Sequence, residues 1–362
     1  MRVWIDILTP KQALFFEPLI ESLKERGDEV IVTSRRYREA ELLLRKRQIN
    51  AEFIGSHGGK ELSNKLSASL ERSQLLLEYF KDDKPDALVS FSSPEASRVA
   101  FGLGIINICV SDSPHAEAVS KLTIPIADCL LTPWIVPEKS WTIYGIERSK
   151  IETYKALDPF VWLTRRDLTE KTHLGLNIDK SKTTISLRLE ESFAAYSKRD
   201  SYTQEFALIQ RLIEEFRNQN IVILCRYSEQ IDAVLKKFKG RVIVPNDVVD
   251  GITLLQQSDL FIGLGGTMTA EAALLGTPAI SFFSGSYFVE RYLVSKGLLT
   301  KPRDIDGVVR VSKNFLRDPK MKKQIKMRAG RIRAGMEDPI QVIIDKLDAL
   351  MRAKLNQELA RN

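Results

Sequence analysis

Residues Ser258–Phe283, SDLFIGLGGTMTAEAALLGTPAISFF, are the most informative stretch of the chain. Leu260–Ile262 is a short apolar run that is typical of a buried parallel strand. It leads into a glycine-rich segment, Gly263–Thr267, and then into a predicted helix, Met268–Leu275, which a Gly-Thr-Pro sequence ends. A second apolar run, Ala279–Phe283, follows at once. The stretch therefore predicts a strand–turn–helix–strand unit whose turn is almost free of side chains.

This turn has the properties of an anion-binding site. Backbone N–H groups at the N-terminus of a helix attract phosphate, and the helix dipole adds to the attraction. Glu271 follows Thr267 by four residues, so both lie on one face of the predicted helix. The spacing is one residue too long for a capping box. The alternative is that the glycines only form a tight turn and that Glu271 only complements the dipole.

Two familiar phosphate motifs are excluded by their spacing. A Walker loop needs Gly-Lys followed by Ser or Thr, and the chain contains no such tripeptide. A dinucleotide fingerprint would need a glycine where Met268 stands, and it belongs in a first βα turn, whereas this turn lies late in the chain. The turn therefore belongs to another kind of α/β arrangement.

The residues of the turn resemble a known signature. Gly265-Gly266-Thr267, with Glu271 and the exit Gly276-Thr277-Pro278, is similar to the C-terminal domain motif of two-domain GT-B enzymes. UDP-N-acetylglucosamine 2-epimerases and the peptidoglycan N-acetylglucosaminyltransferase carry this motif. In those families the turn binds the nucleotide diphosphate and the glutamate binds the ribose hydroxyls. The resemblance implies nucleotide-binding roles for Gly265, Gly266, Thr267 and Glu271.

The whole chain suits two α/β domains, because 362 residues are too many for one hydrophobic core. Apolar runs alternate with amphipathic helical segments, which predicts parallel sheets with right-handed crossovers. With the resemblance, we expect a GT-B-like pair of Rossmann-like, doubly wound domains facing a cleft. The predicted limits are 1–158 for the acceptor or catalytic domain, 159–337 for the nucleotide-sugar-binding domain, and 338–362 for a helix and tail that return across the junction. Leu157–Phe160, which contains an Asp-Pro pair, is the predicted linker.

Composition limits the functional classes. No apolar run approaches the length of a membrane span, and the N-terminus begins with a strand, so we expect a cytoplasmic protein. Three histidines are too few for a multi-histidine metal site, and we predict no metal. The three cysteines show no paired spacing and are predicted to be reduced and buried. The net charge of +7 is moderate, and we expect no nucleic-acid partner. Abundant Lys, Arg, Glu and Ile suggest a thermophile.

Two polar loops follow predicted strands in the first half, where open α/β sheets bind their ligands. Ser90–Glu95 follows strand Ala87–Val89, and Ser111–Glu117 follows strand Ile105–Val110. The second loop supplies Asp112, His115 and Glu117, which can act as a general base or orient a sugar hydroxyl. We predict Asp112 as the base, Glu117 as the second candidate for that role, and His115 as the orienting residue. The alternative is that Ser111, Asp112 or Ser113 caps the next helix, with Pro114 in its first turn.

A further resemblance concerns this second loop. The run from Glu117 through Lys121-Leu122-Thr123 to Pro133 is similar to a segment of the 2-epimerases, although Lys121 stands where they have arginine. A His-Val-Glu-Ala-Gly-Leu-Arg segment of those enzymes is absent, which favours a transferase. The loop after the first strand resembles the acceptor loop of GT-B proteins. The resemblance implies catalytic roles for Asp112, His115 and Glu117, and acceptor- or sugar-binding roles for Thr9, Gln12, Ser92, Ser93, Glu95 and Lys121.

Arg188 lies at the end of the predicted strand Thr183–Leu189, just before its last residue. An arginine at a strand end beside a diphosphate site is a natural clamp, and the position resembles the start of the second domain in the epimerases. The alternative is a surface salt bridge to a neighbouring glutamate. We include Arg188 among the predicted nucleotide-binding residues.

Two charged segments need interpretation. Lys320–Arg333 contains seven basic residues and no acidic one, which predicts a solvated helix face or a peripheral contact with an anionic membrane at its inner face. Asp304-Ile305-Asp306 has the form of a metal–nucleotide motif, but it opens an amphipathic helix, so we predict that it caps that helix.

From Trp4-Ile5-Asp6 to Gly265-Gly266-Thr267, the chain resembles the archaeal and bacterial family called domain of unknown function 354, which is grouped with GT-B proteins. The resemblance implies metal-independent glycosyl transfer from a nucleotide-diphosphate sugar such as a UDP-sugar, which is a substrate, with no cofactor. The acceptor would be a lipid-linked sugar or a polysaccharide. The alternatives are a sugar-nucleotide 2-epimerase and a nucleotide-sugar-binding protein without turnover.

Overall fold

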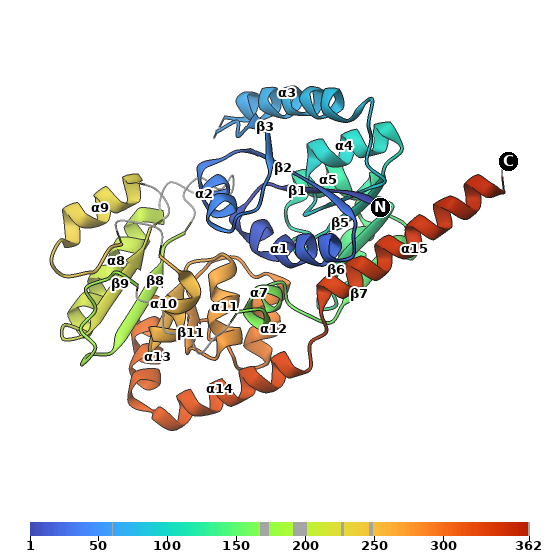
Figure 1. The fold of residues 1–362 in the computed structure, drawn as a ribbon. Helices are drawn as coiled ribbons and strands as arrows, with labels where there is room; N and C mark the ends of the chain where they lie inside the picture. Colours follow the sequence, from blue (N-terminus) through green and yellow to red (C-terminus); the bar gives the residue numbers. More distant parts are fainter. Residues whose placement is uncertain (60, 167–173, 191–200, 226–227, 246–248, 361–362) are drawn as a thin grey trace. The chain divides into compact units, whose positions relative to one another are not determined.

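The computed structural model describes residues 1–59, 61–166, 174–190, 201–225, 228–245 and 249–360. Contacts divide the chain into two compact units, which we call unit 1, Met1–Trp162 with Met336–Asn362, and unit 2, Leu163–Gly335. Each unit is built around one parallel β-sheet (Figure 1). This confirms the predicted α/β class; the domain limits proposed after residues 158 and 337 stay predictions.

Unit 1 contains a seven-stranded sheet in the order β3-β2-β1-β4-β5-β6-β7. All of its paired strands run parallel. The order reverses at β1, so the crevice between the ends of β1 and β4 is the topological switch point, where such sheets bind ligands. The strands are β1 (Arg2–Ile7), β2 (Glu29–Arg36), β3 (Glu52–Ser56), β4 (Ala87–Ser90), β5 (Ile106–Val110), β6 (Cys129–Pro133) and β7 (Ile151–Tyr154).

Helices cover both faces of this sheet (Figure 1). Helix α1 and the C-terminal α15 pack together on one face, and α3, α4 and α5 pack in sequence on the other. The C-terminal segment therefore belongs to unit 1. The helices are α1 (Pro10–Glu25), α2 (Arg38–Lys46), α3 (Leu62–Phe80), α4 (Pro94–Leu103), α5 (Glu117–Thr123), η1 (Ile124–Ile126), α6 (Lys139–Thr142), η2 (Arg148–Lys150), α7 (Phe160–Thr164), which crosses the division between the units, and α15 (Pro339–Leu359).

One core cluster of unit 1 lies between the sheet and helices α3 and α4. Trp4 of β1 is fully buried against Phe80 of α3, with ring centroids 4.4 Å apart, and Leu88 of β4 lies in the same cluster. The Trp4 indole N–H donates a hydrogen bond to the Thr33 hydroxyl at 2.7 Å, which satisfies its polar atom.

Unit 2 contains a four-stranded parallel sheet in the order β11-β10-β8-β9. The apolar run Val242–Val244 predicts a further strand. This prediction is wrong, because Ile243 forms only an isolated bridge to Val222. The elements are β8 (Thr184–Arg188), α8 (Ser201–Glu215), β9 (Asn220–Leu224), α9 (Ser228–Phe238), α10 (Gly251–Gln257), β10 (Leu260–Gly263), α11 (Thr267–Leu275), β11 (Ala279–Ser281), α12 (Phe288–Ser295), α13 (Ile305–Arg317) and α14 (Pro319–Ala334).

The predicted strand–turn–helix–strand unit is confirmed. It is formed by β10, α11 and β11, and Gly276 ends α11 in the left-handed conformation at φ 80°. Within the described residues, no helix has the length and apolar character needed to cross a membrane.

The predicted linker Leu157–Phe160 is not an exposed connection. Leu157 and Asp158 are both buried in unit 1. The Asp158 carboxylate contacts side chains from other parts of the sheet's carboxyl edge, so this segment belongs to the interior of unit 1.

Candidate functional site

The glycine turn of unit 2 has an open approach to the N-terminus of α11. Gly265 and Gly266 have φ values of 104° and 86°, which favour glycine. Gly266 is the N-cap of α11 and offers no side-chain cap. A Cβ atom added to it would meet no described atom within 4 Å. Because the cap residue is a glycine, no side chain from it covers the first N–H groups of α11.

Gly263 serves packing instead. A Cβ atom on Gly263 would collide with the Thr269 side chain of α11. The first glycine of the turn therefore lets the helix lie close to the strand, and Gly265 and Gly266 shape the approach to its N-terminus.

The structure brings Arg188 to the same edge as the turn. Arg188 ends β8 and pairs in register with Gly263 of β10. Its carbonyl accepts a hydrogen bond from the Leu264 N–H at 3.1 Å. The Arg188 side chain is half-buried and lies near the Cys225 thiol. Burial raises the pKa of this thiol to about 12, and the positive charge of Arg188 opposes that rise. The backbone of Arg188 therefore lies beside the glycine turn, and its role as a clamp for a diphosphate stays a prediction.

Glu271 lies one turn further along α11, and its side chain is only 8% exposed. Thr267, at the first position of the helix, is half-buried. A carboxylate near a helix N-terminus is stabilised by the positive end of the dipole. Its predicted contact with ribose stays a prediction.

In unit 1 the loop after β5 is held by two hydrogen bonds. The Ser111 N–H donates to the Leu131 carbonyl at 3.0 Å, and the Tyr144 hydroxyl donates to the Pro114 carbonyl at 2.6 Å. The alternative that this loop caps the next helix is wrong. Helix α5 begins only at Glu117, and its N-cap is Ala116, without a side-chain hydrogen bond.

Asp112 is instead held by a lysine from the first loop. Lys11 Nζ lies 2.7 Å from Asp112 Oδ2 and 2.6 Å from Asp158 Oδ2. The Ser113 hydroxyl donates to the second oxygen of Asp112 at 2.6 Å. The Tyr154 hydroxyl donates to Asp158 Oδ1 at 2.6 Å. These side chains lie at the carboxyl ends of three strands of unit 1, β1, β5 and β7, in one cluster, which we call the Lys11 cluster (Lys11, Asp112, Asp158 and Tyr154).

The charges of the cluster separate the two carboxylates. Asp158 is fully buried, and burial raises its pKa to about 6, with Lys11 opposing and Asp112 adding to the rise. Burial would also raise the pKa of Asp112, but Lys11 lowers it to about 2. Burial lowers the pKa of Lys11, but the two carboxylates outweigh this effect and raise the pKa above its usual value. Lys11 is therefore charged at neutral pH, and Asp112 is ionised and weakly basic.

His115 follows Asp112 by three residues and is exposed. Partial burial lowers the pKa of the His115 imidazole below the usual 6.5, while the negative charge of Asp112 raises it. The imidazole is therefore mainly neutral at neutral pH and accepts a proton more readily than the Asp112 carboxylate.

The two remaining residues of this predicted loop site lie on the surface. Glu117 and Lys121 form an ion pair of 2.6 Å one turn apart on α5, with side chains 66% and 63% exposed. Such exposed pairs contribute little to stability. The structure gives neither residue a contact with Asp112 or His115.

The predicted acceptor residues of the other loops serve mainly the interior. Gln12 accepts a hydrogen bond from the Leu8 N–H at 2.5 Å, and Ser92 adopts φ 51° with its hydroxyl directed to the Val110 carbonyl at 3.4 Å. Ser93 caps α4 by accepting from the Ala96 N–H at 3.5 Å. All three are at least nine-tenths buried, and only Thr9, before α1, is half-exposed. We retain Thr9 alone as an acceptor candidate among these.

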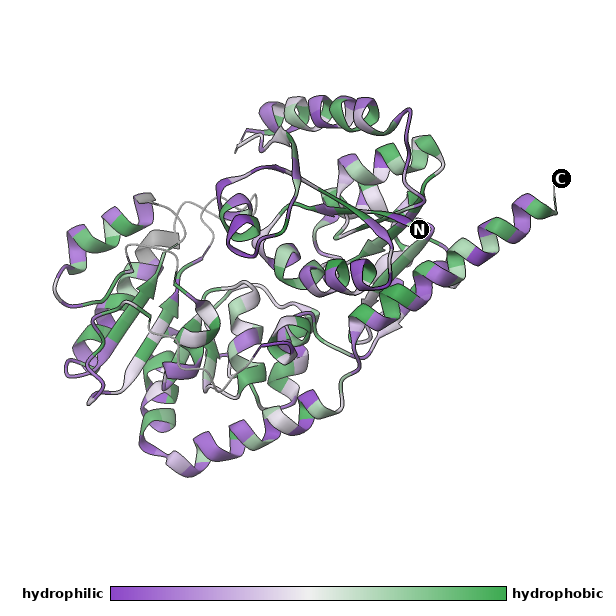
Figure 2. Cartoon of the chain, in the orientation of Figure 1, coloured by the Kyte–Doolittle hydropathy of each residue, from purple (hydrophilic) through white to green (hydrophobic). Residues whose placement is uncertain are grey.

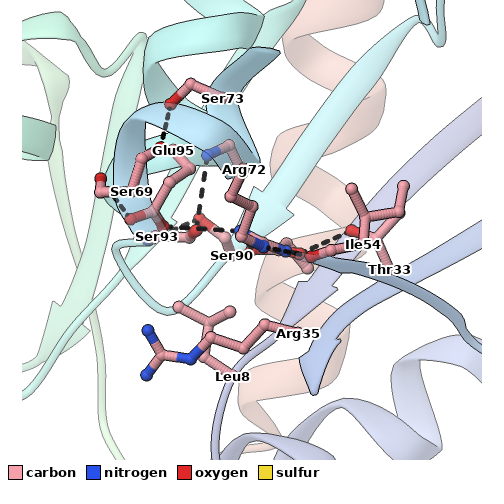
Figure 3. A network of polar contacts seen from close by, with 12 residues as sticks. Leu8, Thr33, Arg35, Ile54, Ser69, Arg72, Ser73, Ser90, Ser93 and Glu95 are labelled. Carbon is pink, nitrogen blue, oxygen red and sulfur yellow. Dashed lines mark hydrogen bonds and ion pairs between the residues drawn. The ribbon is translucent and has the colours of Figure 1, made fainter. Parts of the chain in front are cut away.

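Glu95 belongs to a buried ionic network rather than to an exposed sugar site (Figure 3). Its carboxylate accepts from the Ser69 hydroxyl at 2.6 Å and lies 3.5 Å from Arg72. Arg72, which is 1% exposed, also pairs with Asp6 at 2.6 Å and donates to the Ile54 carbonyl at 2.9 Å. The network fixes α3 and α4 onto the sheet.

Sequence reasoning missed Lys11, Tyr154 and Asp158 as parts of the site. Lys11 lies directly after the first strand, which was a usable signal. The Asp-Pro pair predicts a linker at Asp158, whereas the burial of Asp158 depends on contacts with residues far away in the sequence, such as Lys11.

The remaining predictions concern surface charge, cysteines and metals. Asp304 caps α13 by accepting from the Gly307 N–H at 2.6 Å, as predicted. Cys109 and Cys129 are free and buried, while Cys225 is only half-buried. Helix α14 has mostly hydrophilic residues (Figure 2), and membrane contact through residues 320–333 stays a prediction. Among the described residues, no three or more His, Cys, Asp or Glu side chains gather as metal ligands would.

The two parallel sheets and their connections define a two-domain GT-B fold, and comparison with known proteins agrees. The model of the family described as "Protein of unknown function (DUF354)" matches residues 1–352, and the chain belongs to this family. An uncharacterized protein of Methanocaldococcus jannaschii is 28% identical over 365 residues, which cover 96% of this chain and 98% of the relative.

Solved structures share the fold at low sequence identity. UDP-GlcNAc 2-epimerase from Neisseria meningitidis, bound to UDP-GlcNAc, matches with a TM-score of 0.72 at 14% identity, covering 96% of this chain and 99% of that one. The glycotransferase of kitacinnamycin matches with a TM-score of 0.66, also at 14% identity and with the same coverage of each chain. The chain thus has the GT-B fold that these solved structures share.

Proposed function

We propose that the protein transfers a sugar from a nucleotide-diphosphate donor to a hydroxyl acceptor, without a metal ion. The observation that carries the proposal is the open glycine turn at the N-terminus of α11, with Arg188 at the adjacent strand end. Backbone N–H groups, a helix dipole and a guanidinium together suit a diphosphate that gains negative charge as it leaves.

The donor contacts follow from this arrangement. The N–H groups from Gly265 to Thr267 bind the diphosphate, and Arg188 stabilises the charge that develops on it. Glu271 accepts hydrogen bonds from the ribose hydroxyls. A neighbour with the same fold binds UDP-GlcNAc, which supports a UDP-sugar as the first donor to test.

Acceptor activation is assigned to the loop after β5. The ion pair with Lys11 makes Asp112 a weak base, so we assign proton removal from the acceptor hydroxyl to the neutral imidazole of His115. Asp112 then stabilises the imidazolium that forms, and Lys11 fixes Asp112. These roles exchange the ones that the sequence suggested for Asp112 and His115.

The function is tested in two stages. A thermal-shift panel of UDP-, GDP-, CMP- and dTDP-sugars is expected to single out one donor, because a ligand that binds only the native state raises its stability. The protein is then incubated with that donor in heavy water without an acceptor. A transferase releases nucleoside diphosphate slowly by hydrolysis and leaves no deuterium in the sugar. Deuterium at C2 would instead show the second candidate function, 2-epimerisation, which removes that proton. Binding without either change would indicate a nucleotide-sugar-binding protein.

The roles in the loop after β5 predict a graded result. His115→Ala is expected to lower the rate of diphosphate release about 100-fold or more, because general-base catalysis contributes about that much. Asp112→Asn is expected to lower it less, and both variants should bind the donor as the wild type does. Glu117→Gln is expected to retain release, since its carboxylate is exposed and paired with Lys121. Loss of release in Glu117→Gln alone would return the base role to Glu117.

The role of Glu271 predicts a specific loss of affinity. Glu271→Gln keeps the shape of the side chain and removes its charge, and a hydrogen bond to a charged group contributes about 1.5–3 kcal/mol. Calorimetry should show nucleoside diphosphate binding weakened about tenfold or more. Glu214→Gln, an exposed position on α8, is the matched control and should bind normally. A Glu271→Gln protein that melts earlier but binds normally would show a structural role.

A further inference from the structure

Arg35 lies near the end of β2, opposite an irregularity in the sheet. Ser34 pairs with Phe53 of β3, but Arg36 pairs with Ser56, so β3 carries one extra residue in this interval. Gly55, within the extra length, adopts φ 72°, and a Cβ atom on it would lie 2.9 Å from Arg72. Bulges of this kind change the direction of nearby side chains and are common next to ligand sites.

The guanidinium of Arg35 is not part of the buried network beside it. In that network the oxygens of Asp6 and Glu95 are bound by Arg72, Thr33 and Ser69. Figure 3 shows Arg35 separate from these contacts, with its guanidinium directed away from Arg72 and toward the side of Leu8.

Arg35 therefore has one buried donor, its Nε–H group, without an acceptor among the described residues. Its Nε atom is buried and makes no hydrogen bond with any residue that the structure describes. Burial lowers its pKa below the usual value, while Glu95 and Asp6 raise it through their charge. A buried N–H group without an acceptor is costly, and a planar guanidinium matches the two oxygens of a carboxylate or phosphate.

The position of Arg35 relates it to the proposed acceptor site in the same unit. Strands β2 and β5 lie on opposite sides of the switch point between β1 and β4. Three strand spacings separate Arg35 on β2 from Asp112 after β5, which is about 14 Å between their backbones. A ligand in this crevice with the length of one or two sugar units can reach both ends.

We propose that Arg35 binds an oxyanion of the acceptor, a phosphate or a carboxylate, while the hydroxyl that receives the sugar lies at His115. This proposal rests on the proposed function and adds the chemical class of the acceptor: a negatively charged one. The anion completes the hydrogen bonds of the Arg35 guanidinium, which the network of Arg72 leaves open.

The test observes the Arg35 side chain directly. The full chain is labelled with ¹⁵N-arginine, and the Nε–H signal of Arg35 is assigned by its loss in Arg35→Lys. Inorganic phosphate and glucuronate are then added separately. A saturating shift with phosphate supports a phosphorylated acceptor, a shift with glucuronate supports a carboxylated one, and shifts with both support a general oxyanion site. If neither anion shifts the signal, the proposal is overturned.

A second measurement uses matched variants. Phosphate binding is measured by calorimetry in a Gly266→Val background, so that the glycine turn of unit 2 does not contribute. Arg35→Gln is expected to weaken this binding about tenfold or more. Arg36→Gln removes the same charge from the exposed neighbouring residue and should leave it unchanged. Equal losses in both variants would show a diffuse charge effect and overturn the proposal.

Failure of this inference is distinguishable from failure of the proposed function. Arg35→Gln should bind the nucleotide sugar as the wild type does, because donor binding is assigned to unit 2. Donor binding with a silent Arg35 would leave the transferase proposal standing and reject the anionic acceptor. If anions shift the Arg35 signal but no nucleotide sugar binds, the oxyanion site would stand and the transferase proposal would be rejected.

Discussion

Gly266→Val is expected to abolish nucleotide diphosphate binding while the fold of both units survives. Two effects act together at this position. The valine side chain would occupy the open space in front of α11 that we assign to the phosphates, and the new residue would have to adopt φ 86°. We expect affinity for the nucleoside diphosphate to fall about 100-fold or more, which corresponds to about 2.7 kcal/mol. Isothermal calorimetry with the donor from the thermal-shift panel measures the loss.

The control separates blocked access from backbone strain. Gly240 also lies in unit 2, has φ 78°, and would carry a Cβ atom without any described neighbour within 4 Å. Gly240→Val therefore introduces a comparable strain of about 1–2 kcal/mol away from the turn. It should lower the melting temperature of unit 2 and bind normally. Unchanged affinity in Gly266→Val would place the diphosphate elsewhere.

The turn could be predicted from sequence because its determinants are local. A short apolar run, adjacent glycines and a Gly-x-Pro exit specify strand, turn and helix within Ser258–Phe283. The structure differs there only in detail: α11 begins at Thr267, and β11 ends at Ser281. The local pattern was not sufficient at Val242–Val244. This apolar run has the composition of a strand, but it pairs with the sheet only through the bridge between Ile243 and Val222.

The polar interior of unit 1 was less predictable, because its partners are distant in sequence. Lys11 and Asp112 are 101 residues apart, and Arg72 and Asp6 are 66 apart. Glu95 has the loop position of a ligand residue, yet Arg72 reaches it from the middle of α3 and binds it in the interior. Which carboxylates are free for a ligand depends on such long-range pairs, and no local pattern contains them.

Lys11→Met is expected to cause the largest loss of stability that we predict in unit 1. The substitution removes the cation that Asp112 and Asp158 share and leaves two carboxylates close together, one of them fully buried. Breaking a buried pair in this way costs about 3–5 kcal/mol. All four tryptophans lie in Met1–Trp162, so tryptophan fluorescence during urea unfolding reports on unit 1. Lys121→Met, which breaks the exposed pair with Glu117, should cost at most about 1 kcal/mol.

The loss in free energy of unfolding caused by Lys11→Met should depend on pH, and its direction can be predicted. With Lys11 present, the pKa of Asp158 is about 6, above the usual 3.8, and without Lys11 it should rise further. A carboxyl whose pKa is raised on folding binds its proton more tightly in the folded state, so stability increases as the pH falls through that value. The wild type also gains stability from Asp112, whose pKa of about 2 makes its contribution present above 3.8. The difference between the proteins should therefore be largest at neutral pH and smaller near pH 5.

A second substitution identifies the cause of the lost stability in Lys11→Met. In Lys11→Met/Asp158→Asn the buried negative charge is gone, and the amide can still accept the hydrogen bond that Tyr154 donates to Asp158 in the wild type. We expect the double variant to recover about 1 kcal/mol or more relative to Lys11→Met and to lose most of the pH dependence, because the two residues are coupled. Additive losses would contradict a shared charge pair. They would assign Lys11 a packing role, for which its position 4.8 Å from the Phe91 ring centroid offers a contact.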